Sequence, residues 1–173
     1  MMRALVLAVM MALTLPASPL VGRAHAQEAP AATAFERLKA LEGEWIDPDG
    51  SFSEKGAVAV TYRVTGGGTA VVETFPVGTP GEMVTVYHKD GNDLVLTHYC
   101  TAGNQPRMRA RTVSGNTLAF DFEGGANIDL AVTSHMHSVK FEFLGPDEIR
   151  ATWSNWEKGK PNHEGVFRVV RKK

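Results

Sequence analysis

Apolar and polar residues alternate along most of the chain from residue 44 to the C-terminus, in short runs separated by Gly, Pro, Asn and Asp. A period of two is typical of strands with one buried face, and turn residues at regular intervals are typical of antiparallel hairpins. The pattern predicts about ten strands, near residues 44–47, 57–65, 69–75, 82–88, 93–101, 107–113, 117–122, 136–144, 147–154 and 165–171. A longer connection, residues 123–134, could form a short helix or a flap.

A helical spacing precedes the strands. Thr33 and Glu36 are placed as in a capping box, in which both side chains satisfy free N–H groups of the first helical turn. Three apolar residues then share one face of a short helix that Gly43 ends, namely Phe35, Leu38 and Leu41. Residues 27–32 are rich in Ala and Pro, and we expect them to form a flexible leader.

One helix followed by about ten antiparallel strands predicts an all-β domain over residues 33–173, an up-and-down barrel, because closure of the sheet removes exposed strand edges. Alternation then predicts which side chains face the interior. They are Leu94, Leu96, His98, Cys100, Met108, Ala110, Leu118, Phe120, Phe122, His137, Val139, Phe141, Phe143, Ile149, Ala151 and Trp153. The pattern leaves the direction of Glu73 open, and an inward Glu73 would be a buried carboxylate that marks a functional site.

The N-terminus has the features of a secretory signal peptide. Arg3 precedes an apolar run that is too short to span a membrane, and Ala24-His25-Ala26 offers a cleavage site after Ala26. We therefore expect residues 1–26 to be removed, the mature protein to be periplasmic or secreted, and no membrane span to remain. Loss of Arg3 and Arg23, with no acidic residue, changes the formal net charge from −1 to −3. An acidic protein has no long-range attraction for nucleic acid, and a single cysteine, Cys100, forms no internal disulfide.

The predicted first strand carries a family resemblance. The stretch Leu41-Glu42-Gly43-Glu44-Trp45 resembles the Gly-x-Trp signature that opens the barrel of the calycins, which include lipocalins, fatty-acid-binding proteins and nitrobindin-like haem barrels. The resemblance implies that Trp45 lies across the closed end of the barrel and that an arginine of the last strand, Arg168 or Arg171, stacks on it. The stretch from His98 to Met108 is also similar to exported bacterial proteins. That similarity implies no activity.

The calycin resemblance implies a cup that holds a small, mostly apolar molecule. We therefore predict that the barrel binds a small hydrophobic or amphipathic ligand, with apolar residues supplying affinity and histidines orienting the ligand. The predicted ligand-binding residues are Leu96, His98, Cys100, Met108, Phe120, His137, Phe141 and Trp153.

Two alternatives stay open. In the first, the barrel handles a metal or haem and is possibly an enzyme: His135 and His137 would face the same way on one strand, and His98, His88 or Cys100 could add a third ligand. A haem would need one axial imidazole, from His98, His137 or His163. In the second, the barrel is filled and acts only through its surface as an interaction module. The residues assemble no nucleophile–base pair, since His98 and Cys100 lie about 7 Å apart along a strand, so we assign no catalytic residue.

Arginines at alternate positions form a stripe on another predicted strand, namely Arg107, Arg109 and Arg111. A nucleic-acid interface would interleave aromatic residues on that face, and this strand has none. We predict instead that the stripe pairs with Asp or Glu on the neighbouring strands.

Overall fold

The structure, a computed structural model, describes residues 30–173. The predicted signal peptide and the first residues of the predicted leader lie outside the described residues. The elements are α1 (Pro30–Lys39), β1 (Gly43–Ile46), β2 (Val58–Thr65), η1 (Gly66–Gly68), β3 (Ala70–Phe75), β4 (Met83–Asp90), β5 (Asp93–Tyr99), β6 (Gln105–Ser114), β7 (Thr117–Ala126), β8 (His135–Gly145), β9 (Glu148–Glu157) and β10 (Lys160–Arg171).

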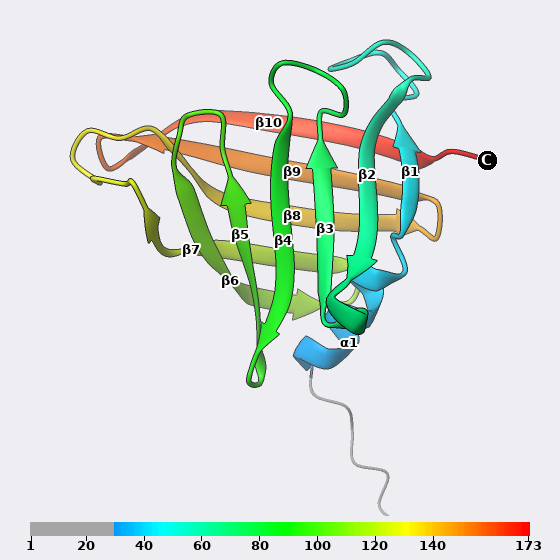
Figure 1. Cartoon of the computed structure of the whole chain (residues 1–173), viewed down its shortest axis with the longest axis horizontal. Helices are drawn as coiled ribbons and strands as arrows, with labels where there is room; N and C mark the ends of the chain where they lie inside the picture. The colour runs from blue at the N-terminus through cyan, green and yellow to red at the C-terminus, as the bar shows by residue number, and fades with distance from the viewer. Residues whose placement is uncertain (1–29) are drawn as a thin grey trace, which may run out of the picture.

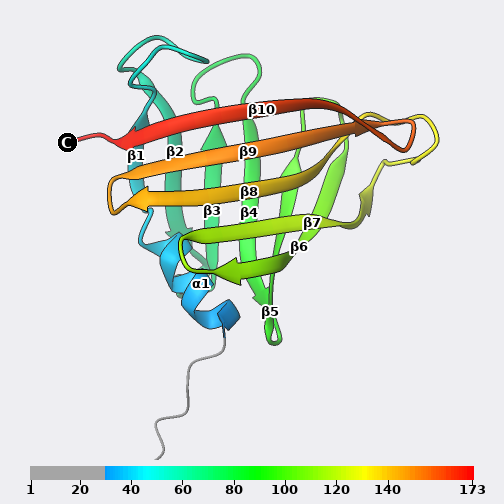
Figure 2. The same ribbon diagram turned by 180° about the vertical axis from the view of Figure 1, so that it is seen from behind.

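The strands form a closed antiparallel barrel in which each strand pairs with its neighbours in sequence, and β10 closes the barrel by pairing with β1. Figures 1 and 2 show β2 to β5 running steeply across β8 to β10, so the barrel is flattened into two crossing layers. The predicted fold class, an up-and-down barrel of ten strands with a short N-terminal helix, is confirmed. The last hairpin is longer than predicted, because its turn lies at Lys158 and Gly159 and β10 begins at Lys160.

Helix α1 covers one end of the barrel and packs against β2, β4, β5 and β6 (Figure 1). Its predicted apolar face is confirmed for Phe35 and Leu38, which are buried. Leu41 is also buried but lies in the turn after the helix, which ends at Lys39 and not at Gly43 as predicted. The predicted start is wrong: the helix already includes Pro30, so Thr33 lies within it and does not cap it.

A tryptophan of β1 contacts an arginine of β10, the first and last strands of the barrel, beside this helix. The guanidinium carbon of Arg171 lies 4.5 Å from the ring centre of the fully buried Trp45. The same guanidinium donates to the carbonyl oxygens of Ala40 and Glu42, both at 2.8 Å. Gly43 has φ +129°, a backbone conformation that residues with a Cβ rarely adopt. A Cβ there would also lie 3.4 Å from the Arg171 guanidinium.

The second candidate arginine has another role. Arg168 pairs with Glu148 and Asp49, at 2.8 and 3.0 Å, on the outside of the barrel. Of the two arginines proposed from the resemblance, Arg171 therefore makes the cation–π contact.

Large side chains fill most of the barrel interior. The residues that are fully buried there include Tyr87, Leu94, Leu96, Met108, Leu118, Phe120 and Phe141. At the end away from α1, Phe52 from the β1–β2 connection meets Phe75 and Phe167, with ring centres 4.7 to 5.5 Å apart. The predicted inward faces are thus confirmed for all of these core residues except Tyr87, for which no direction was predicted. The interior holds much less free space than a wide cup.

A β-bulge in β8 changes the direction of two predicted residues. Met136 pairs with Asn155 and Ser138 pairs with Ser154, so His137 is an extra residue without a partner in β9. An extra residue shifts the alternation by one. Met136 therefore packs against the core, while His137 lies on the outer face beside Ser138 and Asp121. The prediction that His137 faces inward is wrong.

Candidate functional site

A small cavity of about 50 Å³ remains at the end of the barrel away from α1. It lies between strands from both layers of the flattened barrel. Its lining residues are Glu73, Phe75, Met83, Thr85, His98, Met136, Trp153 and Phe167. The cavity therefore combines one carboxyl, one hydroxyl and one imidazole with apolar walls, which is the composition of a site for a small molecule.

The polar groups of this cavity belong to an inward-facing row across β2, β3, β4 and β5, which we call the inner row. Tyr62 pairs with Glu73, Glu73 with Thr85, and Thr85 with His98, each directly opposite its partner in an antiparallel ladder. Directly opposite residues on one face have Cβ atoms about 4.5–5.5 Å apart, so their side chains meet. Strand pairing therefore assembles a contiguous polar row from four separate segments of the sequence.

Glu73 is buried in this row, with only 5 % of its surface exposed. The Tyr87 hydroxyl donates to its Oε2 at 2.5 Å. Burial raises the pKa of Glu73 to about 7, while hydrogen bonds from Tyr87 and Tyr62 act in the opposite direction. Burial, and then the Glu73 charge, raise the pKa of Tyr87 well above its usual range, so this phenol stays a donor. Near neutral pH, Glu73 is thus divided between its protonated and ionised forms.

His98 ends the row and is 4 % exposed. Its Nδ1 lies 2.9 Å from the Thr85 hydroxyl, and its ring centre lies 4.9 Å from that of Trp153. Burial lowers the pKa of His98 to about 4, so the imidazole is neutral at physiological pH. Among residues 30–173, its buried Nε2 has no hydrogen-bond partner. A buried polar atom left without a partner costs about 1–3 kcal/mol, and a bound ligand could remove that cost.

Two of the predicted ligand-binding residues, His98 and Trp153, line this cavity. Four others, Leu96, Met108, Phe120 and Phe141, are fully buried in the packed core and do not line it. Cys100 is half-buried in a turn after β5, where its N–H donates to the Asn104 carbonyl oxygen at 3.1 Å, so the predicted strand ends earlier than residue 101.

The histidines proposed as metal ligands do not all lie at one site. His135 is buried outside the cavity, and its two ring nitrogens already lie 3.1 Å from the Thr133 carbonyl oxygen and from Nδ1 of His137. His137 and His163 line the outer face, while His98 lines the interior. No group of three His, Cys, Asp or Glu side chains in residues 30–173 is arranged to hold a metal ion. A cavity of about 50 Å³ beside His98 also has no room for a haem.

Two of the three arginines in the stripe, Arg107 and Arg109, pair with acidic residues as predicted, whereas Arg111 forms no ion pair within residues 30–173. Arg109 contacts Asp93, Glu123 and Asp90, and Arg107 contacts Asp90 and Glu123. These ion pairs join β6 to β7 and to the β4–β5 hairpin on the outer surface.

The sequence reasoning missed most of the cavity lining. Phe75, Met83, Thr85, Met136 and Phe167 come from four strands, and their convergence depends on strand pairing and on the β8 bulge. The sequence contains one signal for this site. Glu73 follows two valines in a strand, and an inward carboxylate at that position would mark a functional site. Its partner Tyr62 shows the same alternation in β2.

No protein-family model matches the chain, and no curated protein matches it in sequence. Nor does the part of the chain that the structure describes include a helix long and apolar enough to cross a membrane.

Proposed function

We propose that the protein binds a small neutral amphipathic molecule in the cavity at the end of its barrel away from α1. The observation that carries the proposal is the buried, unpartnered Nε2 of His98, a residue that lines this cavity together with Glu73. The polar group of the ligand would bond His98 and Glu73, and its apolar part would lie against Trp153 and Met136. A neutral ligand fits best because neutral His98 offers no charge to balance a buried anion.

The size of the cavity limits the ligand. About 50 Å³ accepts a few non-hydrogen atoms, whereas sites for drug-sized ligands measure about 300–1,000 Å³. The ligand is therefore a short amide or alcohol, or the polar head of a longer molecule. A longer molecule would have to part Phe52 from Phe75 and Phe167, which close this end of the barrel.

We also propose that the barrel is calycin-like and that the protein is exported. The closed ten-strand barrel and the contact of Arg171 with Trp45 support the first point. The apolar run and the small-residue cleavage site before Gln27 support the second.

Ligand-observed NMR on the mature chain with butyramide, n-butanol and butyrate tests the binding proposal. We expect the amide and the alcohol to bind with saturation transfer from Trp153, and the carboxylate to bind much more weakly above pH 7. Substitution His98→Leu removes the ring nitrogens and is expected to abolish binding of the amide. Glu73→Gln keeps a neutral polar group in the cavity, and this variant is expected to retain binding of the amide.

His163→Leu is the matched control, because His163 is exposed and does not line the inner cavity. Equal binding by wild type and His98→Leu, or saturation transfer that bypasses Trp153, would overturn the proposal. Circular dichroism and thermal unfolding confirm that each variant is folded before it is compared.

A further inference from the structure

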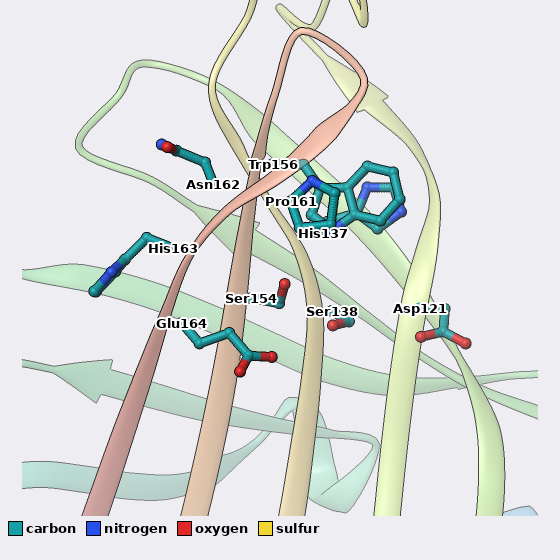
Figure 3. Close-up of a pocket in the computed structure, with 9 residues that line it drawn as sticks. All are labelled: Asp121, His137, Ser138, Ser154, Trp156, Pro161, Asn162, His163 and Glu164. Atoms are coloured by element: carbon teal, nitrogen blue, oxygen red, sulfur yellow. The ribbon is translucent and has the colours of Figure 1, made fainter.

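The outer face of β7 to β10 carries a second, larger concavity of about 700 Å³, which we call the outer groove (Figure 3). Its lining residues are Asp121, His137, Ser138, Ser154, Trp156, Pro161, Asn162, His163 and Glu164. The groove lies outside the barrel on β7 to β10, whereas the inner row lies inside it on β2 to β5. It is separate from the cavity proposed above to hold a ligand.

Four of these residues form a row of cross-strand partners, the outer row. Asp121 of β7 pairs with Ser138 of β8, Ser138 with Ser154 of β9, and Ser154 with Glu164 of β10. Each adjoins an inward-facing residue in its strand, as Asp121 adjoins Phe120 and Ser154 adjoins Trp153, so alternation places it outside. The row therefore presents a carboxylate, two hydroxyls and a second carboxylate across four adjacent strands, and Figure 3 shows them in this order.

An aromatic wall bounds one end of the outer groove. The indole of Trp156 stacks on the imidazole of His137, with ring centres 3.8 Å apart and planes 10° apart. His137 in turn stacks on Phe122 at 5.1 Å and bonds His135 through Nδ1. The β8 bulge makes this stack possible by turning His137 outward. Trp156 is thus held in place beside the polar row.

The polar groups of the outer row are unoccupied by protein partners. Ser154 is only 9 % exposed, lines the groove, and its hydroxyl has no hydrogen bond with any group in residues 30–173. Asp121 and Glu164 form no ion pair within that range, and no Lys or Arg lines the groove. Burial and then the charge of His135 lower the pKa of His137, so it adds no positive charge at neutral pH.

We propose that the outer groove binds a short saccharide and prefers an amino sugar to an acidic one. Carboxylates accept hydrogen bonds from sugar hydroxyls, while serine hydroxyls both donate and accept, so the row matches a ligand with several hydroxyl groups. Trp156 offers an apolar wall for a ring face. The two carboxylates line a groove that has no Lys or Arg in its lining. Arg109, which stands opposite Asp121 in β6, is paired with Asp90, Asp93 and Glu123. The concave surface therefore has a negative potential, which attracts an ammonium group and repels a uronate.

The polar centre of the row favours a saccharide over a simple diamine. A diamine could place an ammonium near Asp121 and another near Glu164, but its methylenes would then cover the hydroxyls of Ser138 and Ser154. A Ser154 hydroxyl covered in this way would lose its contact with water and gain no new partner, which is unfavourable. A sugar hydroxyl at this position would satisfy it. The size of the groove, about 700 Å³, also suits a mono- or disaccharide.

The test uses three disaccharides with the same β-1,4 linkage: one of glucosamine, one of glucose and one of glucuronic acid. Binding to the mature chain is followed by amide chemical shifts in NMR at mildly acidic pH, where the amino groups are protonated. We expect the glucosamine disaccharide to bind about tenfold more tightly than the glucose disaccharide, and the glucuronic acid disaccharide not to bind. The shifted amides should be those of the outer row and Trp156.

Two pairs of variants make the test specific. Ser154→Ala should lower the affinity for both the glucosamine and the glucose disaccharide roughly 3- to 10-fold. Glu164→Gln should remove most of the preference for the amino sugar. Thr152→Ala and Glu142→Gln remove a hydroxyl and a carboxylate from the same outer face outside the groove, and should change neither affinity.

Three results would overturn the inference. The first is that the glucuronic acid disaccharide binds as tightly as the glucosamine disaccharide. The second is that putrescine shifts the same amides and binds as tightly as the glucosamine disaccharide. The third is that no sugar at millimolar concentration shifts the amides of the groove. His98→Leu should leave sugar binding intact, which separates this test from that of the interior cavity.

Discussion

The inner and outer rows are built in the same way but behave as different chemical environments. Each consists of four residues that stand directly opposite one another on four adjacent strands. In the inner row, burial shifts the pKa of Glu73 up to about 7 and that of His98 down to about 4, and these groups bond mainly to protein. In the outer row, the carboxylates of Asp121 and Glu164 are exposed and form no ion pair within residues 30–173. Whether a polar row faces the interior or the solvent, and not its residue types, therefore decides whether its groups bond to one another or are free to bind a large ligand.

The largest expected difference comes from placing a new carboxylate in each row. Thr85→Asp adds a charge at a position 2 % exposed, beside Glu73, and should destabilise the protein by about 4 kcal/mol or more. Ser138→Asp adds the same group to the outer row and should change the free energy of unfolding by less than about 1 kcal/mol. Urea unfolding followed by circular dichroism measures both. Thr85→Val is the control for loss of the hydroxyl alone, and equal effects of the two aspartates would remove the distinction between the rows.

The second test separates the two titrating groups of the inner row. The pKa of Glu73 rises from 4.5 in the unfolded chain to about 7 in the folded one, so the unfolded state binds fewer protons between these values and stability falls as pH rises through this window. The pKa of His98 falls from 6.5 to about 4, so its contribution to stability rises with pH across that range. In the wild type the two slopes oppose each other from about pH 4.5 to 6.5.

Relative to wild type, His98→Leu should therefore lose roughly 3 kcal/mol of stability as pH rises from 4 to 6.5, because only the slope of Glu73 remains. Glu73→Gln should gain a similar amount between pH 4.5 and 7. Glu164→Gln in the outer row should leave the pH profile unchanged. Chemical denaturation at a series of pH values measures all three, and slopes of the opposite sign would show that these groups are not buried as described.

A smaller effect follows from removing one hydroxyl from each environment. Tyr87→Phe takes away the donor to Glu73 and should cost about 1.5–3 kcal/mol above pH 7, where Glu73 is ionised. The loss should shrink near pH 5, where Glu73 is protonated. Ser138→Ala should cost less than about 0.5 kcal/mol at either pH. A pH-independent loss in Tyr87→Phe would indicate a packing defect in place of a lost hydrogen bond.

The smallest effect tests the outward position of His137. His137→Ala removes its stack with Trp156 and should cost about 1 kcal/mol, with a change in tryptophan fluorescence. His163→Ala, in the same groove, should have almost no effect on stability. A loss of about 3–5 kcal/mol would be typical of an aromatic side chain removed from the core, and would place His137 inside the barrel.

Local pattern was sufficient for much of the fold. The alternation of residues such as Leu118 and Phe120 predicted both the strands and their inward faces, because one face of each strand is buried and the side-chain period is two. The same logic predicted that His98 faces inward. It failed at His137, because a single extra residue in β8 reverses the alternation and leaves no mark in composition.

The inner site could not be assembled from the sequence, although its most informative member was visible there. Alternation did not decide whether Glu73 faces inward, and its partners Tyr62, Thr85 and His98 come from three other strands. Register between strands depends on how all of them close into one barrel. The free volume inside depends on how side chains such as Phe120 and Phe141 interdigitate, which no single segment specifies.

The amino-acid order thus determined which segments become strands and which of their faces are apolar. Those properties depend on short-range spacing. Closure of the barrel decided that Arg171 meets Trp45, that Glu73 and His98 share one small cavity, and that His137 joins Trp156 on the outer face. These outcomes depend on register, on one bulge and on packing, which arise only when distant segments lie side by side.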